Sequence, residues 1–357
     1  MRILVTGHKG YIGTVMIPML LDKGYDVVGL DSDLYEECTF GSGIQDIPEI
    51  KKDIRDVEAA DLDGIDTVIH LAGLSNDPLG DLNPTLTYEI NYNASVCLAQ
   101  LAKEVGVTRF IFSSSCSTYG VAGENMVTED AEFNPVTPYG KSKVLVEQEV
   151  AKLADSDFSP VFLRNATAYG VSPRLRFDLV LNNLVAWAFT TNRVYIKSDG
   201  TPWRPIVHIE DISRAFIAVI DAPREQIHNQ AFNVGITEEN YQIRDLAKIV
   251  EETIPGCRIE FAEDSGPDKR CYRVNFHKLM TTLPGYKPKW NARQGAEQLY
   301  AAYRTVGLTL EDFEGPRYKR IAYIKKALSD DRLDETLRWK NCKSTETTKK
   351  LETDYVI

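Results

Sequence analysis

Residues 3–16, ILVTGHKGYIGTVM, join a short apolar run to a longer apolar segment through Gly7, Gly10 and Gly13. This pattern predicts a strand that turns directly into a helix. Glycine permits the unusual dihedrals of a tight turn, and the missing Cβ lets the backbone approach a pyrophosphate closely. The helix N-terminus then offers free N–H groups and a positive dipole end to that anion. The spacing G-x-x-G-x-x-G differs from the commoner G-x-G-x-x-G, so the turn alone is a weak signal.

A second apolar run, YDVVGLD, ends in Asp31, eighteen residues after Gly13. An acidic residue at the tip of the second strand accepts hydrogen bonds from both hydroxyls of an adenosine ribose and repels a 2′-phosphate. Together with the glycine turn, Asp31 therefore favours NAD over NADP as the cofactor.

Strand-length apolar runs alternate with helical segments over the first 170 residues. The runs are RILVTG, YDVVGLD, TVIHLAG, RFIFSSS and SPVFLRNATAYG. This alternation predicts an α/β fold with a doubly wound parallel sheet, the Rossmann arrangement. We expect residues 1–170 to bind NAD, with segments near 205–240 returning to that domain. Residues 171–330 are expected to form mainly a smaller C-terminal substrate-binding cap, and the polar residues 340–357 a mobile tail.

Composition excludes several classes of partner. The 357 residues include 41 Lys and Arg and 52 Asp and Glu, a formal net charge of −11, which disfavours nonspecific nucleic-acid binding. The six cysteines include no C-x-x-C pair and predict neither a zinc site nor a disulfide framework, so no metal is expected. The chain shows neither a signal-peptide pattern nor an apolar run of membrane-spanning length. We therefore expect a cytoplasmic protein with no membrane partner.

The stretch VTPYGKSK places Tyr139 four residues before Lys143, after a strand that ends in Ser113, Ser114 and Ser115. Residues i and i+4 share a helix face, so the phenol and the ammonium can point into one cleft. A nearby ammonium favours phenolate, and bringing a tyrosine pKa from about 10 towards neutrality requires about 4 kcal/mol. Alone, this pair is ordinary helix sequence. Following the cofactor turn and the serine strand, it indicates that Tyr139 is a general acid/base, aided by Lys143 and Ser115.

The ordered motifs resemble the extended short-chain dehydrogenase/reductase family, in its NAD-dependent sugar-nucleotide epimerase/dehydratase branch. The matching pieces are TGHKGYIG, Asp31, KDIRD (52–56), HLAG (70–73), SSSCSTYG (113–120), YGKSK (139–143), LRNATAYG (163–170) and SDGTPWRPIVHIEDI (198–212). The resemblance implies Ser115, Tyr139 and Lys143 as catalytic residues. It implies that NAD is bound by Gly7, Gly10, Tyr11, Ile12, Gly13, Asp31, Asp53, Ile54, Leu71, Ala72, Gly73, Asn91, Ser113, Tyr139, Lys143 and Ala166.

The resemblance also implies a nucleotide-diphosphate sugar as substrate and a homodimer formed through helices near 84–105 and 140–154. Paired arginines suit a diphosphate in geometry and charge, and Arg204 and Arg270 match that role. The other implied substrate-binding residues are Ser75, Asn76, Ser115, Thr167, Asn183, Leu184 and Tyr195, the last being equally compatible with the core. Arg174 and Arg176 are further candidates, for which a solvated surface position is the preferred interpretation.

Two residues after the catalytic serine bear on the reaction. The resembling dehydratases carry an acid pair where this chain has Cys116 and Ser117, and related decarboxylases usually carry a glutamate at the second position. Transient oxidation at the sugar C4 followed by 4-epimerisation is therefore the preferred hypothesis. A 4-ketoreductase or dehydrogenase ranks second and a dehydratase lower. A catalytically silent binding or scaffold relative is the non-enzyme alternative, although such relatives usually lose the tyrosine or the lysine.

Overall fold

The computed structural model of the chain describes residues 1–41, 43–75, 83–266 and 271–340. Asn76, Arg270 and the predicted polar tail beyond Lys340 therefore lie outside the described residues. Within the described ranges, no helix has both the length and the apolar character needed to cross a membrane.

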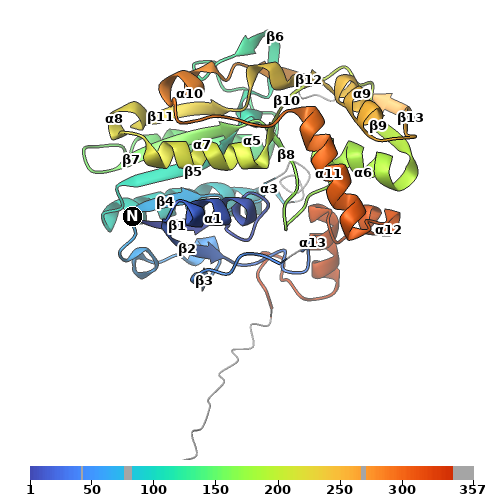
Figure 1. Cartoon of the computed structure of the whole chain (residues 1–357). Helices are drawn as coiled ribbons and strands as arrows, with labels where there is room; N and C mark the ends of the chain where they lie inside the picture. Colours follow the sequence, from blue (N-terminus) through green and yellow to red (C-terminus); the bar gives the residue numbers. More distant parts are fainter. Residues whose placement is uncertain (42, 76–82, 267–270, 341–357) are drawn as a thin grey trace, which may run out of the picture.

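A central sheet of seven parallel strands confirms the predicted doubly wound fold (Figure 1). In spatial order the strands are β11 (Gln230–Val234), β7 (Ser159–Asn165), β5 (Arg109–Ser115), β4 (Thr67–His70), β1 (Arg2–Thr6), β2 (Asp26–Asp31) and β3 (Glu49–Lys51). The order reverses at β1, where the chain runs outward first to β2 and β3 and then to β4. In such sheets ligands bind at the carboxyl ends of the strands beside this reversal.

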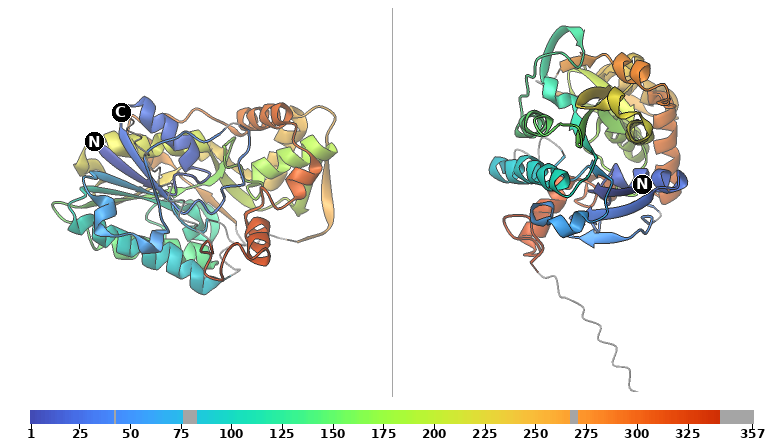
Figure 2. Two further views of the ribbon diagram at one scale, coloured as in Figure 1. Left: turned by 90° about the horizontal axis from the view of Figure 1, so that it is seen from below. Right: turned by 90° about the vertical axis from the view of Figure 1, so that its left-hand side faces the viewer.

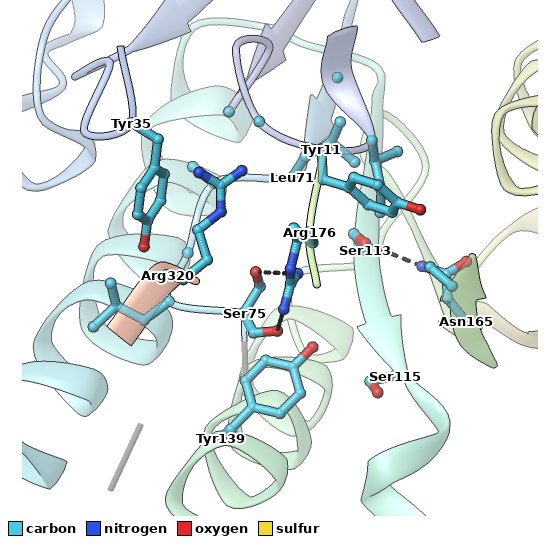
Figure 3. A pocket seen from close by; sticks show the side chains of 18 of the residues that line it. Tyr11, Tyr35, Leu71, Ser75, Ser113, Ser115, Tyr139, Asn165, Arg176 and Arg320 are labelled. Atoms are coloured by element: carbon cyan, nitrogen blue, oxygen red, sulfur yellow. Dashed lines mark hydrogen bonds between the residues drawn. The ribbon is translucent and has the colours of Figure 1, made fainter. Parts of the chain in front are cut away.

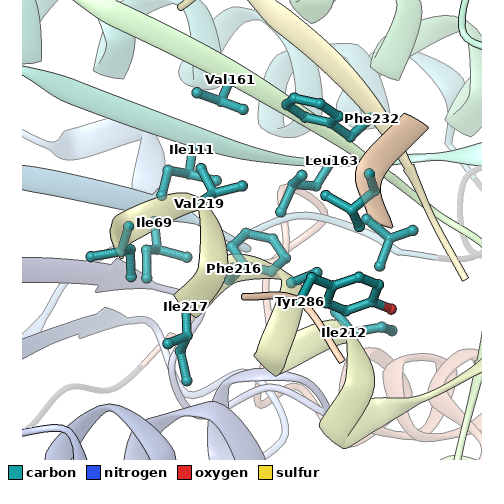
Figure 4. Close-up of a cluster of buried hydrophobic side chains, with 14 of the residues drawn as sticks. Ile69, Ile111, Val161, Leu163, Ile212, Phe216, Ile217, Val219, Phe232 and Tyr286 are labelled. Atoms are coloured by element: carbon teal, nitrogen blue, oxygen red, sulfur yellow. The ribbon is translucent and has the colours of Figure 1, made fainter. Parts of the chain in front are cut away.

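The sheet is buried on both faces, as its continuous apolar strands predict. Ile3 and Val5 of β1 join one cluster with α1 (Gly13–Asp22) and α7 (Ile209–Asp221), while Leu4 joins a second cluster on the other face. That second cluster includes α4 (Ala94–Glu104) and α5 (Pro138–Ala151). Figure 2 shows helices on both sides of the sheet, and Figure 4 shows Phe216 of α7 among the side chains of the first cluster.

The remaining elements complete the fold, many of them beside the carboxyl ends of the central strands. They include a three-stranded sheet of β12 (Asn240–Gln242), β10 (Trp203–His208) and β8 (Thr167–Tyr169), and two strand pairs, β13 (Arg258–Gly266) with β9 (Arg193–Ser198) and β14 (Cys271–Val274) with β6 (Val121–Val127). The helices are α3 (Pro84–Tyr88), α6 (Val180–Thr191), α8 (Arg224–Ile227), α9 (Ile243–Thr253), α10 (His277–Thr282), α11 (Ala292–Val306), α12 (Leu310–Glu314) and α13 (Arg320–Ser329). A third apolar cluster joins α6, α9 and α11. Helix α7 and strand β11 pack with the first domain, while β10 pairs with β8.

Candidate active site

A cavity of about 380 Å³ lies at the carboxyl ends of the central strands (Figure 3). Its walls include most of the residues predicted from the motifs: Gly7, Gly10, Tyr11, Ile12, Gly13, Asp31, Asp53, Ile54, Leu71, Ala72, Gly73, Ser75, Ser113, Ser115, Tyr139, Lys143, Ala166, Thr167 and Arg204. Residues that are far apart in sequence thus meet in one place.

The glycine turn has the predicted strand–turn–helix context, with a refinement in the role of each glycine. Gly7 has φ +73°, and a Cβ there would lie 2.7 Å from the backbone nitrogen of Ala72 at the end of β4. A Cβ on Gly13 would collide with the carbonyl oxygen of His8. These two glycines are required by the close packing of the turn itself, whereas a Cβ on Gly10 would meet only the carbonyl oxygen of Gly7, at 3.0 Å. The compact turn brings the N-terminus of α1 to the cavity, which suits a pyrophosphate.

The carboxylate of Asp31 is oriented by two backbone donors. Its oxygens accept hydrogen bonds of 2.9 Å from the backbone N–H groups of Lys9 and Asp33. Each oxygen keeps lone pairs for the hydroxyls of a ribose. The ammonium of Lys9, within the turn, is bound by Glu49 at 2.7 Å and Asp33 at 3.3 Å. The lysine of the turn is therefore already paired, in keeping with a cofactor that lacks a 2′-phosphate.

Tyr139 and Lys143 lie on successive turns at the beginning of α5. Thr137 caps this helix by accepting the N–H of Gly140 at 3.1 Å. Tyr139 therefore lies in the first helical turn, where the helix dipole favours a negatively charged phenolate. The ammonium of Lys143 donates to the carbonyl oxygen of Ser113 at 2.7 Å and lies 5.7 Å from the centre of the Tyr139 ring. In Figure 3, Tyr139 and Ser115 lie in the same cavity, from α5 and the end of β5.

Burial lowers the pKa of Lys143 to about 7, although the nearby carboxylate of Glu147 acts to raise it. In the unfolded chain a lysine has a pKa of about 10.4, so between these values the unfolded chain binds more protons than the folded one. This group therefore takes stability away from the folded protein as the pH falls from about 10.4 to 7.

Lys143→Met should accordingly raise the stability of the cofactor-free protein more at pH 7 than at pH 9.5. The reason is that the variant has no amine whose protonation favours unfolding. Thermal unfolding of the wild type and the variant at both pH values measures the change. A difference in Tm that is the same at both pH values would contradict the lowered pKa.

A buried ion pair links α5, which carries Tyr139 and Lys143, to the neighbouring strand β7. Arg164 on β7 and Glu147 on α5 are each 5% exposed. The guanidinium donates from Nε to both carboxylate oxygens at 3.1 Å and from Nη2 to one of them at 2.7 Å. Ser114 on β5 also hydrogen-bonds to Glu147, so the pair links three elements that carry the site.

Four predicted site residues are not brought to the cavity wall. Asn91 is 2% exposed, and its amide exchanges hydrogen bonds with the backbone of Leu74 at 2.7 and 3.0 Å. It holds the chain after β4 rather than facing the cavity. In the cap, Asn183 donates to the carbonyl of Phe177, Leu184 lies in the third apolar cluster, and Tyr195 packs against Trp187. None of these four is among the described residues that line the cavity.

The motifs missed other residues that do line the cavity, notably Tyr35, Tyr272 and Arg320, and the further candidate Arg176 also lines it. The surface interpretation of Arg174 and Arg176 was wrong, since they are 2% and 7% exposed. Arg176 forms an ion pair with Asp178 and donates a hydrogen bond of 3.0 Å to the hydroxyl of Ser75 (Figure 3). The basic residues of SPRLRFD were a visible signal, whereas nothing near Tyr35 or Arg320 matched a pattern.

The two positions that distinguish dehydratases carry no acid here. Cys116 is 1% exposed, its thiol donates to the carbonyl of Arg164 at 3.1 Å, and burial raises its pKa. Ser117 lines the cavity beside Ser115. Glutamate is absent from the described residues of the cavity wall. The wall therefore offers a phenol and hydroxyls for proton transfer at one oxygen, but no glutamate for an elimination.

Comparison with known proteins matches residues 3–235, more than half of the chain, to the NAD dependent epimerase/dehydratase family. The chain belongs to this family. NAD is its cofactor, in agreement with the glycine turn and Asp31. The match includes the motifs around Ser115 and Tyr139 and strand β11, and it ends before α9 and the C-terminal helices.

Relatives along nearly the whole length agree with this assignment. The UDP-glucose 4-epimerase of Bacillus subtilis (strain 168) is 28% identical over 329 residues, covering 84% of this chain and 95% of that protein. The structure of UDP-glucuronic acid 4-epimerase from Bacillus cereus, in complex with UDP-glucuronic acid and NAD, is 26% identical with a TM-score of 0.72 and covers 86% of this chain and 100% of that one. The structure of MoeE5 in complex with UDP-glucuronic acid and NAD is 26% identical with a TM-score of 0.74, and the match covers 85% of this chain and 99% of that one.

Proposed function

We propose that this protein interconverts two nucleotide-diphosphate sugars that differ in configuration at C4. One observation carries the proposal: Tyr139, Lys143 and Ser115 face one cavity with the NAD motifs, whereas Cys116 and Ser117 supply no acid for an elimination. The site is therefore equipped to oxidise and reduce a single carbon.

In this proposal the residues at the two ends of the cavity have separate tasks. The glycine turn and the N-terminus of α1 hold the pyrophosphate, Asp31 binds the adenosine ribose, and Asp53 and Ile54 contact the adenine. When bound, NAD takes a hydride from the sugar carbon and returns it to the opposite face. Lys143 binds the nicotinamide ribose, and the backbone of Ala166 contacts the nicotinamide.

Tyr139 carries the proton transfer. Its phenol oxygen takes the proton of the 4-hydroxyl as the carbon is oxidised and gives it back when the carbon is reduced. The first turn of α5 and the ammonium of Lys143 favour the phenolate form that this step requires. Ser115 hydrogen-bonds to the reacting oxygen and holds it beside the phenol. The same residue can thus act on both epimers, because the proton leaves from and returns to one oxygen.

On the substrate side, Arg204 binds the diphosphate of the sugar nucleotide, and Ser75 and Thr167 face the sugar. The relatives named above act on or bind uridine nucleotides, which makes UDP-sugars the first class to test. A 4-ketoreductase is the second candidate, because the same phenol could protonate a supplied ketone. Asp31 and the paired Lys9 disfavour it, since they suit NAD retained through a cycle better than NADPH consumed in one.

Incubation of the purified protein with UDP-, dTDP-, GDP- and CDP-sugars tests the proposal. We expect NAD to copurify, and NMR to reveal interconversion of two C4 epimers without net formation of NADH. Stoichiometric NADH formation, or consumption of NADPH with a 4-keto sugar, would contradict epimerisation. A protein inert towards the whole panel would favour the scaffold alternative.

The homodimer remains part of the proposal. Its interface is formed by α4 and α5, which pack against each other on one face of the sheet. Light scattering tests the homodimer, and a monomer in solution would contradict it. Cytoplasmic residence is also proposed, supported by free thiols at the five described cysteines.

A further inference from the structure

The C-terminal segment, residues 310–340, lies beyond the part of the chain that matches the family model. It packs against the chain that follows β2 and β3; Asp31 is the last residue of β2, and Asp53 lies just after β3. Arg332 pairs with Glu37, and the indole of Trp339 donates to the carbonyl of Ser32 at 3.0 Å.

Contacts to the chain after β3 complete this attachment. Arg338 forms an ion pair with Asp56, and Arg55 donates to the carbonyl of Thr336 at 3.0 Å. Leu337 reaches the wall of the cavity beside Ile54. The segment therefore covers the adenosine end of the cofactor site.

A charged side chain of the segment also lines the cavity. Arg320, the first residue of α13, is 4% exposed, and its guanidinium lies 3.8 Å from the centre of the Tyr35 ring (Figure 3). Its Nη2 donates to the carbonyl of Arg174 at 3.1 Å, and Arg174 in turn donates from Nε to the carbonyl of Lys9 in the glycine turn. Arg320 is thus one residue removed from the turn that receives the pyrophosphate.

The charge of Arg320 is only partly balanced within the described part of the chain. Lys9, Lys52 and Arg176, which also line the cavity, each pair with a carboxylate. Arg320 forms no ion pair with the residues described, and its Nη1 has no hydrogen-bond partner among them. Burial lowers the pKa of its guanidinium, although the carboxylate of Asp178, which does not pair with Arg320, acts to raise it. A buried cation that pairs with no anion is costly, and a ligand anion that supplies this pairing lowers the cost.

We propose that Arg320 binds the pyrophosphate of NAD, so that the C-terminal segment completes the cofactor site. The guanidinium fork suits phosphate oxygens and would add to the anion-binding N-terminus of α1. This inference goes beyond the proposed reaction, because NAD must be held whichever chemistry follows.

The test compares Arg320→Met with Arg317→Met in the full chain freed of NAD. Arg317 is the matched control: it lies in the same segment, is exposed, donates to the carbonyl of Thr39 and does not line the cavity. Calorimetry measures the affinities for NAD, ADP and adenosine. Because adenosine lacks the diphosphate, the comparison isolates the contribution of the pyrophosphate to binding. For Arg320→Met we expect NAD and ADP to bind about ten- to a hundredfold more weakly, with adenosine within about twofold of wild type. Arg317→Met should bind all three as the wild type does.

Unchanged ADP affinity would overturn the proposal, and so would equal weakening of ADP and adenosine, which would mean that Arg320 only packs Tyr35. Normal NAD binding with a raised KM for the sugar nucleotide would also overturn it, by placing the arginine on the substrate. The melting temperature of each cofactor-free variant, measured alongside, checks that it is folded. If Arg320→Met does not fold, Arg320→Lys replaces it, because this variant keeps the charge but loses the guanidinium fork. It must still bind ADP more weakly relative to adenosine than the wild type does. An unchanged ratio of the two affinities would overturn the proposal.

Discussion

Tyr139→Phe should lower kcat for epimerisation by about 10²- to 10⁴-fold, the usual contribution of a positioned general acid/base. The substitution removes one oxygen and leaves the ring in the first turn of α5. NAD content should stay near that of wild type, because the glycine turn and Asp31 lie on other elements. Turnover is measured by NMR of the nucleotide sugar, and NAD content by release from the denatured protein.

The matched control is Tyr195→Phe, the same change at a tyrosine that packs against Trp187 outside the cavity wall. This variant should retain wild-type turnover. If Tyr139→Phe kept more than about a tenth of wild-type kcat, another group would have to carry the proton, and the assignment of Tyr139 would be wrong.

Arg164→Met should lower the free energy of unfolding by about 3–5 kcal/mol. The change leaves the carboxylate of Glu147 buried with no guanidinium, although Ser114 still hydrogen-bonds to it. It also removes the hydrogen bond of 3.0 Å from Arg164 to the phenol of Tyr119. Urea unfolding of the cofactor-free protein measures the loss.

The double variant Arg164→Met/Glu147→Leu is the control for charge burial. Replacing both partners by apolar groups removes the uncompensated carboxylate, so much of the lost stability should return. A single-variant loss below about 1 kcal/mol, or a double variant less stable than Arg164→Met, would contradict the account of this pair.

The central fold was predictable because its strands are buried on both faces. Five of the seven strands are continuous apolar runs, and their alternation with helical segments locates them. Strand β3, Glu49–Lys51, is short and carries one apolar residue, so no local pattern marks it. The contacts of residues 310–340 were equally invisible, because their partners lie far away in sequence, as in the ion pair of Arg338 with Asp56.

The residues of the candidate site also divide into those that local sequence predicts and those that it does not. Gly7, Gly13, Tyr139 and Lys143 were predictable because a local constraint, a turn or a helix face, fixes their geometry. Asn91 was placed on the cofactor side by its motif, yet its side chain instead secures the backbone of Leu74. Arg176 and Arg320 depend on tertiary burial, which no spacing in the sequence records.

The most direct test of the central claim follows deuterium placed at C4 of a nucleotide sugar that the protein accepts. Internal oxidation and reduction at one carbon predicts that the C4 epimer keeps the label at C4, with no label in released NADH or in water. Unlabelled substrate in D₂O should likewise gain no deuterium on carbon. Label found on another carbon, in free NADH or in the solvent would contradict C4 epimerisation by Tyr139 and retained NAD.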